Sequence, residues 1–464
     1  MTTRAALDRT LLLMRDFLRP ETPDDSMMEA LISTRIALVS DRLNLSSNSA
    51  QSAFVSLAMM AARSGAEIHL VAPRTKLIGR QSPLSSNELL EGLLEVGSDL
   101  IPDIEIHEGE SPGRFDAAIV LGNTRWRGSA GHVARIGADE WSGSISAIGD
   151  PAPFSKGDFP FGGLVAAALA CSEIFKASMR KLREFAVDPS LFDEYFAPTR
   201  SAAVSLSPGR ARAFAGGLGS FDLVSAGAIS HSVLFALSRI PDVRGRVRIL
   251  DPETSDVSNL NRYALLRRSR LNTTKVADLE KHDLGLLVTG QAVRFRRGDS
   301  SLVPSLAPTV LVGVDHIPTR WDVQSAQTHW LAIGATTHYS AMASFHDARV
   351  PCAACLHPVD DDNDAPIPTV AFVSFWAGLM LASLFVHHLA GDTLPLNQQQ
   401  LFFSPLRPES GIWMSPVARR DNCILTCATR PLGGRPIGPV TESEVSLTHE
   451  RGPCDLPKNK FGSH

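Results

Sequence analysis

Short apolar strands alternate with helices along the whole chain, and this alternation constrains its fold more than any other feature. In the first half, the strand-like runs RIALVS (35–40) and EIHLVA (67–72) flank SAQSAFVSLAMMAARSG (49–65), which has helical periodicity and ends on a glycine. FDAAIVLG (115–122) is a further strand, and GGLVAAALACSEIFKASMRKL (162–182) closes the half as a helix rich in small residues. Strands that alternate with helices predict a parallel sheet with helical crossovers.

The second half repeats this order. SFDLVSAG (220–227) is a strand that enters a turn of small residues, ISHSVLFALSRI (229–240) is a helix, and GRVRILD (245–251) is the next strand. TVLVGVD (309–315) is a later strand that also ends on an aspartate, and the apolar run at 369–386 corresponds in position to the closing helix of the first half. The repeated order predicts an α/β fold of two tandem, doubly wound, Rossmann-like domains.

Length and charge limit the class of protein. A chain of 464 residues with 44% hydrophobic and 20% charged residues is globular and long enough for two cores, and we place the domains at residues 1–200 and 201–464. The formal net charge of −4 gives no electrostatic reason to expect nucleic acid or an anionic membrane as a partner. The uncharged run at 369–386 is long enough to be a membrane-helix candidate, but we expect a buried helix there and a cytoplasmic protein.

The first candidate site residues lie where strands of the second half end. The turn SAGAIS (225–230) keeps Gly227 of the glycine pattern with which nucleotide-binding turns approach phosphate, and serines stand at the flanking positions. Taken alone, this motif would favour a tight strand-to-helix turn that binds nothing. Asp251 ends the next strand, where an acid in a doubly wound sheet accepts hydrogen bonds from a ribose in NAD and ATP sites alike.

The residues after Asp251 favour a triphosphate. Asn259 and Arg262 follow in the loop, and Lys275 stands at the start of a predicted helix. Arginine and lysine offset phosphate charge and stabilise the charge that develops on a departing pyrophosphate. Asp315 ends a later strand at the same carboxyl edge, where an isolated carboxylate among phosphates would hold Mg2+. A nicotinamide-dependent oxidoreductase has no need of this set.

In this order the five residues resemble the ThiF/MoeB and ubiquitin-activating enzyme superfamily. The run DPETSDVSNLNRY at 251–263 is similar to the signature of that superfamily, Asp-x-Asp/Glu-Thr-x-x-x-Ser-Asn-Leu-x-Arg, and departs from it at Tyr263, where Gln is usual. The resemblance extends over nearly all of residues 201–431 and includes the sequence around both cysteine pairs.

The resemblance implies a role for each position. Asp251 would bind the ribose of ATP, Asn259, Arg262 and Lys275 would hold the triphosphate, and Asp315 would bind Mg2+. A carboxylate would attack the α-phosphate and give an acyl-adenylate and pyrophosphate, so Arg262, Lys275 and Asp315 would be the catalytic residues. The implied partners are a ubiquitin-like protein, whose C-terminal tail would lie toward Asp315, and a ubiquitin-conjugating-type enzyme that accepts the product.

Two close cysteine pairs predict a structural zinc site. Six cysteines in a chain of this length do not make a disulfide framework. Four thiolates are the ligand set of a closed tetrahedral zinc site, and similar enzymes carry such a zinc away from the active site. The alternative is two unrelated buried pairs. The candidate ligands are Cys352, Cys355, Cys423 and Cys427.

The chain departs from the superfamily at the thioester cysteine. Relatives that form a thioester place a nucleophilic Cys between the first cysteine pair and the long helix, where this chain has none and Thr369 stands about at the expected position. Cys171 lies in an apolar helix and is expected to be a buried structural thiol. Cys454 lies in a tail flanked by Pro and Gly, where nothing nearby would lower its pKa. We expect adenylation without the typical thioester, with Cys454 as the remaining candidate acceptor.

The first half lacks the chemical set. Pro73 stands where Asp251 would be, and no Ser-Asn-Leu-x-Arg follows it. This half resembles an inactive adenylation domain that pairs with the active one as an internal pseudo-dimer, with a homo-oligomer as a further option. In relatives an arginine from the partner half reaches the ATP phosphates. The candidates here, which could also form a solvated helix face, are Arg4, Arg9, Arg15 and Arg19.

Three hypotheses about function remain open at this point. The first is activation of a ubiquitin-like protein, and the second is adenylation of a small peptide or metabolite carboxylate, which the missing cysteine fits equally well. The third is a non-catalytic scaffold, which the eroded SAGAIS turn favours and the intact set from Asn259 to Asp315 disfavours.

Overall fold

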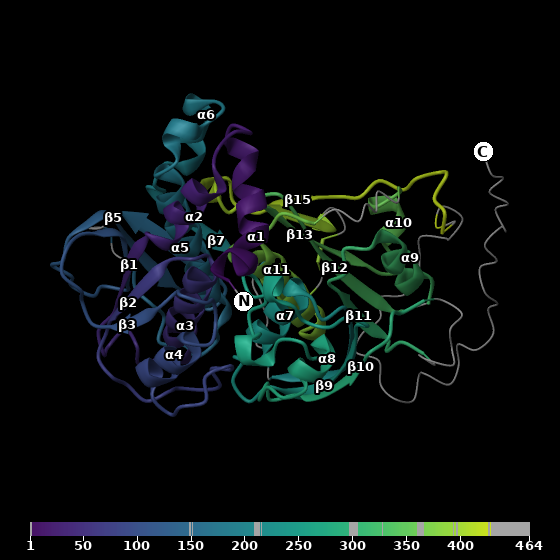
Figure 1. The fold of residues 1–464 in the computed structure, drawn as a ribbon. Helices are drawn as coiled ribbons and strands as arrows, with labels where there is room; N and C mark the ends of the chain where they lie inside the picture. The colour runs from purple at the N-terminus through teal and green to yellow at the C-terminus, as the bar shows by residue number, and fades with distance from the viewer. Residues whose placement is uncertain are drawn as a thin grey trace.

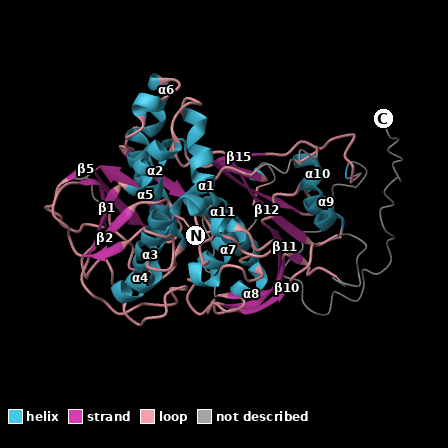
Figure 2. Cartoon of the chain, in the orientation of Figure 1, coloured by secondary structure: helices cyan, strands magenta, loops and turns pink. Residues whose placement is uncertain are grey.

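The computed structural model describes residues 2–147, 150, 152–207, 214, 216–296, 305–326, 328–359, 366–392, 394–395, 398–425 and 427. These residues form two mixed β-sheets with helices packed between and around them (Figures 1 and 2). The predicted α/β class with parallel, Rossmann-like sheets is confirmed.

The first sheet is built from the first half of the chain. Its strand order is β3 (Ile106–Glu108), β2 (Glu67–Val71), β1 (Arg35–Val39), β4 (Phe115–Leu121), β5 (Ala130–Ala138), β6 (Ser142–Ala147) and β7 (Ser201–Ser205). The strands from β3 to β5 are parallel, and β6 and β7 are antiparallel additions. Because β7 pairs with β6, this sheet extends beyond the predicted boundary at residue 200.

The second sheet has the same order with one strand more. It runs β10 (Leu287–Gln291), β9 (Arg244–Leu250), β8 (Gly217–Val224), β11 (Thr309–Val312), β12 (Trp330–Thr337), β13 (Ser340–His346), β14 (Gln400–Phe403) and β15 (Trp413–Ser415). Its strands from β10 to β12 are parallel and the rest antiparallel. The sequence analysis did not predict the antiparallel strands of either sheet.

Four helices fill the space between the sheets. They are α3 (Asn48–Arg63), α5 (Phe161–Arg180), α7 (Ala228–Leu237) and α11 (Ala371–Leu389). α3 packs on α5 and α7 packs on α11, and α11 also contacts α3 and α5 (Figure 1). The other helices are α1 (Thr3–Met14), α2 (Asp24–Ile32), α4 (Leu89–Gly97), α6 (Pro189–Phe196), α8 (Lys275–Leu279), α9 (Ile317–Ser325) and α10 (Ala353–Leu356).

The apolar character of α5 and α11 reflects this central position. By length and composition both could cross a membrane, but 100% and 89% of their most apolar windows are buried within the protein. Apolar residues all around a helix are expected where neighbours enclose it on every side. The prediction of a buried helix at 369–386 is therefore confirmed by α11.

The two sheets differ on their outer faces. Against the second sheet, an apolar cluster joins Val310 and Ile333 of the strands to Val323 of α9. The corresponding cluster on the first sheet, with Ala37, Val120 and Trp126, contains only strand and loop residues. The prediction of a doubly wound first domain was wrong in this respect, because the β4–β5 connection (122–129) contains no helix that could cover this face.

Candidate nucleotide site

The carboxyl edge of the second sheet gathers the predicted site residues. β8 lies between β9 and β11, so the winding of the chain changes direction between β8 and β11. In open α/β sheets, ligands bind at such a switch point, outside the carboxyl ends of the strands. Asp251 follows β9 directly and Gly227 lies in the turn after β8. Asp315 lies beyond β11, which ends at Val312 and not at Asp315 as predicted.

The turn after β8 is tied to Asp251. Ala226 N donates a hydrogen bond to Asp251 Oδ2 at 2.7 Å, and Glu253 N donates to Oδ1 at 2.8 Å. Burial raises the pKa of Asp251, whereas the charge of Lys275 and these two N–H donors lower it. The carboxylate therefore joins the β8–α7 turn to the β9 loop.

The β8–α7 turn keeps the geometry of a glycine turn although it has lost a glycine. Ser225 has a φ of +94°, a conformation that glycine adopts easily and serine rarely. Its hydroxyl accepts a hydrogen bond from Gly227 N at 3.0 Å. Gly227 supplies no side-chain cap to α7, which leaves the N–H groups of its first turn available, as in a phosphate-binding turn.

The loop after Asp251 is held together by hydrogen bonds among its own residues. Asp256 N donates to Asn259 Oδ1 at 3.0 Å and Ser258 N donates to Asp256 Oδ1 at 2.7 Å, which makes a capping box on the short turn Val257–Asn259. The Arg262 guanidinium donates to Ser258 O and, at 2.8 Å, to Asn261 Oδ1. Burial lowers the pKa of Arg262. Asn259 and Arg262 are thus held side by side in one folded loop.

Lys275 begins α8 and turns back toward this loop, as predicted. Its ammonium group is hydrogen-bonded to the Glu253 carboxylate and lies 5.4 Å from the ring centroid of Tyr263. Burial lowers the pKa of Lys275, but Tyr263, Asp251 and Glu253 outweigh it and the net shift is upward. Lys275 therefore remains a cation. The sequence analysis assigned no role to Glu253 or Tyr263, although both stand within the signature run.

Asp315 lies apart from the other site residues, on the far side of β8. It is exposed, and its Oδ1 accepts a hydrogen bond from its own neighbour His316 N at 3.0 Å. Arg320 donates two hydrogen bonds to Val314 O, at 3.0 and 2.8 Å, and so fixes the backbone next to Asp315. The structure brings Asp315 to the same sheet edge, while Asp251, Lys275 and Tyr263 form one connected group.

The structure distinguishes among the four N-terminal arginines. Arg4 and Arg15 both pair with Asp24, and Arg19 donates to Glu184 O at 2.6 Å. Arg9 interacts electrostatically with Arg262 and, after burial, helps to lower its pKa. It lies on the part of α1 that packs against the Val257–Asn259 turn.

Asn261 and Thr369 connect α1, the loop and the start of α11. Asn261 Nδ2 donates to Thr10 Oγ1 at 3.0 Å and to Thr369 O at 3.2 Å, and Thr369 N donates to Arg9 O at 3.1 Å. Thr369, at the position expected for a thioester cysteine, is buried. The predicted burial of Cys171 is confirmed, and burial raises the pKa of its thiol to about 12. Cys454 lies outside the described residues.

In the first half, a side chain of that same half lies at the equivalent sheet edge. Asn44, in the loop between β1 and α3, donates to Asp41 Oδ1 at 3.0 Å and to Thr124 Oγ1 at 2.9 Å. A Cβ atom at Gly122 would lie 1.9 Å from Asn44 Oδ1, so this side chain is packed directly onto the end of β4. Asn44 therefore occupies the carboxyl end of β4 beside β1, the place in the first sheet that corresponds to the switch point of the second.

The four predicted zinc ligands are brought together. Cys352 Sγ lies 3.9 Å from Cys355 Sγ and 3.4 Å from Cys423 Sγ, and Cys355 Sγ lies 3.2 Å from Cys427 Sγ. Tetrahedral zinc with bonds of about 2.3 Å holds its sulfurs about 3.8 Å apart, so small movements would complete the site. All four are buried beside Trp321 of α9. The ligand set fits structural zinc, and two unrelated pairs are excluded.

A second group of potential ligands, on β2 and β3, has a different character. Glu67 Oε1 lies 2.6 Å from His69 Nε2 and 3.8 Å from His107 Nε2. Arg35 Nε lies 3.4 Å from the same carboxylate oxygen and already supplies a positive charge to it. We interpret this group as an ion-pair cluster.

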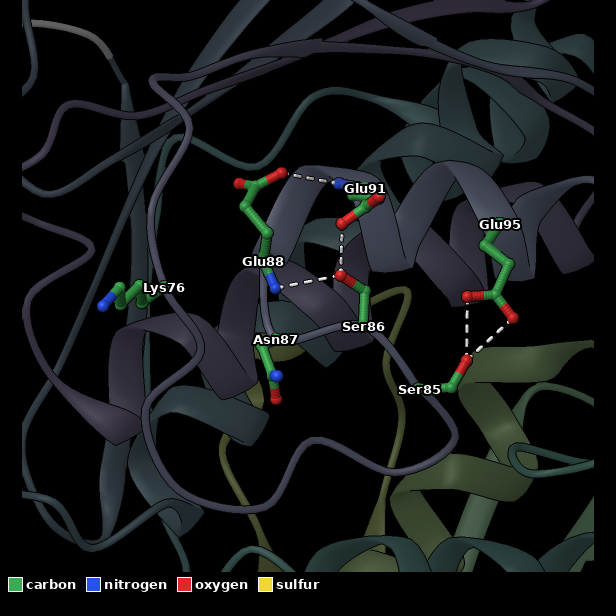
Figure 3. Close-up of a pocket in the computed structure, with 7 residues that line it drawn as sticks. All are labelled: Lys76, Ser85, Ser86, Asn87, Glu88, Glu91 and Glu95. Carbon is green, nitrogen blue, oxygen red and sulfur yellow. Dashed lines mark hydrogen bonds between the residues drawn. The ribbon is translucent and has the colours of Figure 1, made fainter.

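Two hollows lie away from the candidate site. One, of about 710 Å3, borders the start of α4, where Ser86 Oγ donates to Glu91 at 2.6 Å and Ser85 Oγ donates to Glu95 at 2.7 Å (Figure 3). The other, of about 1060 Å3, lies between residues 76–87 and the α7–β9 turn, at the amino edge of the second sheet. The acidic side chains of the first hollow, and the position of the second at the sheet edge opposite Asp251, give no reason to place a nucleotide in either.

Fold and site together define an α/β protein with two Rossmann-like sheets, one of which carries charged side chains at its switch point. A family model described as the BilD N-terminal domain matches residues 35–192. This match covers most of the first half and ends before β8.

Individual relatives are distant. Uncharacterized protein y4jF of Sinorhizobium fredii (strain NBRC 101917 / NGR234) is 26% identical over 232 residues, which are 48% of this chain and 43% of that protein. The chain thus matches less than half the length of this curated relative. Among solved structures, a crystal structure of E. coli MccB with MccA-N7isoASN aligns with 63% of this chain and 97% of that chain at 14% identity, with a TM-score of 0.38.

Proposed function

We propose that this chain is an ATP-dependent adenylyltransferase that activates the C-terminal carboxylate of a ubiquitin-like protein for a conjugating enzyme. One observation carries the proposal: Asp251, Arg262 and Lys275 converge with an uncapped helix N-terminus at the switch point of the second sheet. Cationic side chains and backbone N–H groups at this place are suited to a triphosphate.

Each residue has a separate task in this chemistry. Asp251 accepts hydrogen bonds from the ribose hydroxyls, and Asn259, Arg262 and Lys275 bind the phosphates. Lys275 has to exchange its ion pair with Glu253 for a phosphate oxygen, which the exposure of Glu253 allows. Mg2+ held at Asp315 would offset phosphate charge.

The reaction needs no nucleophilic side chain. A carboxylate oxygen of the substrate attacks the α-phosphorus, the bond to the bridging oxygen breaks, and pyrophosphate leaves with the electron pair. Arg262 and Lys275 stabilise the charge that builds up on the phosphates, and the site positions the reactants. Because Thr369 is buried and not a cysteine, the acyl-adenylate would pass directly to a conjugating enzyme.

The first half would serve as the inactive partner of an internal pseudo-dimer. Its equivalent edge is filled by Asn44, and the sheets share one strand order. The cysteine cluster would hold a structural Zn2+, which fixes α10 to the segment at 423–427. These assignments agree with a cytoplasmic protein.

Two alternatives keep part of this proposal. The missing cysteine also suits a small peptide or metabolite carboxylate as the substrate, because such a product needs no transfer through an enzyme thioester. A non-catalytic scaffold is favoured by Ser225 in a glycine conformation. The connected group of Asp251, Lys275 and Tyr263 argues against the scaffold.

Pyrophosphate exchange into ATP tests the proposal. We expect exchange that depends on Mg2+ and on a ubiquitin-like protein ending in Gly, that is lost in Asp315→Ala and that is kept in Cys454→Ala. Exchange with a short peptide and not with any ubiquitin-like protein would select the first alternative. Absence of both exchange and ATP binding would leave the scaffold.

A further inference from the structure

A buried arginine from the first half holds the nucleotide loop of the second. Arg63, the last residue of α3, is 1% exposed. Its Nη1 donates to Leu260 O at 2.6 Å, and its Nη2 donates to Leu266 O at 2.6 Å and to Ala264 O at 3.3 Å. These three carbonyls surround Arg262 and Tyr263 in the chain, so a single guanidinium spans the segment that follows Asn259.

The same arginine also faces the helix that carries Lys275. Asp278, three residues after Lys275 in α8, interacts electrostatically with Arg63. Asp278 Oδ2 lies 3.7 Å from His282 Nε2, and both Asp278 oxygens, Arg63 Nε and His231 Nδ1 are buried without a hydrogen-bond partner among the described residues. Arg63 therefore lies between both phosphate-binding elements.

A matching contact runs in the opposite direction. Arg239 follows α7, the helix equivalent to α3, and is also 1% exposed. Its Nη2 donates to Ser82 O of the first half at 2.9 Å, and its own carbonyl accepts from Asn48 Nδ2 at 2.8 Å. The segment at 81–83 follows β2 as 260–266 follows β9. It carries none of the proposed phosphate-binding residues.

We propose that Arg63 is a positioning residue through which the first half orders the phosphate-binding loop of the second. The ordering of the loop by Arg63 is inferred from the hydrogen bonds alone. Its effect on ATP chemistry rests on the proposed function. The rigid fork of arginine presents donors on separate nitrogens and can bind carbonyls on both sides of the segment, whereas the three donors of lysine radiate from a single nitrogen. The protein would then need its inactive half because the phosphate-binding loop of the active half would not be ordered without Arg63.

Arg239 provides the matched control, because it has the same burial and the equivalent place but serves the inactive half. We would compare Arg63→Met, Arg63→Lys and Arg239→Met in the full chain by hydrogen exchange and by pyrophosphate exchange. We expect both Met variants to lose a similar amount of stability. Amide exchange should rise at 257–266 in Arg63→Met and at 78–85 in Arg239→Met.

In the activity assay, Arg63→Met should raise the KM for ATP and lower kcat/KM at least tenfold per folded molecule. Arg239→Met should stay within about twofold of wild type, and Arg63→Lys should be intermediate. If Arg63→Met does not fold, hydrogen exchange and pyrophosphate exchange would be measured on Arg63→Lys instead. Unchanged amide exchange at 257–266, or equal loss of activity in both Met variants, would overturn the proposal. Absence of pyrophosphate exchange in the wild-type protein would contradict the proposed function. Amide exchange at 257–266 would still show whether Arg63 orders the loop.

Discussion

At the scale of single residues, the state of Lys275 depends on neighbours that the local sequence does not reveal. The Glu253 carboxylate accepts a hydrogen bond from its ammonium group, and the Tyr263 ring lies beside it. A lysine at a helix start is unremarkable, whereas a buried lysine that stays charged next to Asp251 is suited to an anionic ligand.

Lys275→Ala should lower the rate of pyrophosphate exchange by about 100-fold or more, because it removes a cation that stabilises phosphate charge in a shielded site. Lys281→Ala, at an exposed position a few residues further on, should leave the rate unchanged. Steady-state kinetics with varied ATP would measure both variants. Similar rates for the two variants would remove Lys275 from the site.

At the scale of elements, α1 and the cysteine segments each bring distant parts of the chain together. α1 is the first helix of the chain, yet it packs on the Val257–Asn259 turn and on the start of α11 through Arg9, Thr10, Asn261 and Thr369. The cysteine pairs likewise join α10 to residues 423–427.

Arg9→Ala should raise the KM for ATP several-fold, because Arg9 is the N-terminal arginine that lies near Arg262. Arg15→Ala is the matched control from the same helix region, since Arg15 pairs with Asp24 instead. The measurement is pyrophosphate exchange at limiting ATP. A larger effect of Arg15→Ala than of Arg9→Ala would contradict this assignment.

Cys352→Ser should abolish stoichiometric zinc and lower the free energy of unfolding by several kcal/mol, because structural zinc sites contribute folding energy directly. Metal content by mass spectrometry and chemical denaturation would measure the two effects, with Cys454→Ser as the control. Chelation of wild-type protein should reproduce the loss of stability. Full zinc content in Cys352→Ser would exclude the four-cysteine site.

At the scale of the whole molecule, two sheets of one strand order enclose a shared layer of helices. Arg63 of the first half is hydrogen-bonded to a loop of the second half, and Arg239 of the second half is hydrogen-bonded to a loop of the first. Such an arrangement couples the stability of one half to that of the other. Titratable groups buried in either half therefore affect the free energy of unfolding of the whole chain.

Stability should fall as the pH is lowered from about 6.5 to 4. Burial lowers the pKa of His346 to about 4, while an unfolded histidine titrates near 6.5. Between these values the unfolded chain binds the proton and the folded chain does not, so stability that is fully present above about pH 6.5 is lost as pH falls, by roughly 2–3 kcal/mol for this group. Urea denaturation across this range should show a smaller decline in His346→Gln. An equal decline in both proteins would exclude His346 as a source.

Much of the fold was predictable because it depends on local patterns. The parallel strands and the helices α3, α5, α7 and α11 follow from apolar periodicity and lie close to their predicted positions. The antiparallel strands were not predicted, and the outer face of the first sheet lacks its expected helices. Pairing of short strands such as β7 and β15 depends on which edge the rest of the sheet leaves open, and no local pattern records that.

The sequence by itself determined the α/β class, the order of Asp251, Asn259, Arg262, Lys275 and Asp315, and the two cysteine pairs that cluster in the structure, because strand–helix alternation and short-range spacing carry this information. Only the tertiary structure decided that Arg9 and not Arg4, Arg15 or Arg19 lies near Arg262, that Asn44 fills the first half, and that Arg63 supports the loop. Arg63 and Leu260 are 197 residues apart in the chain. Contacts of this kind exist only once both sheets have formed and the helices between them have packed.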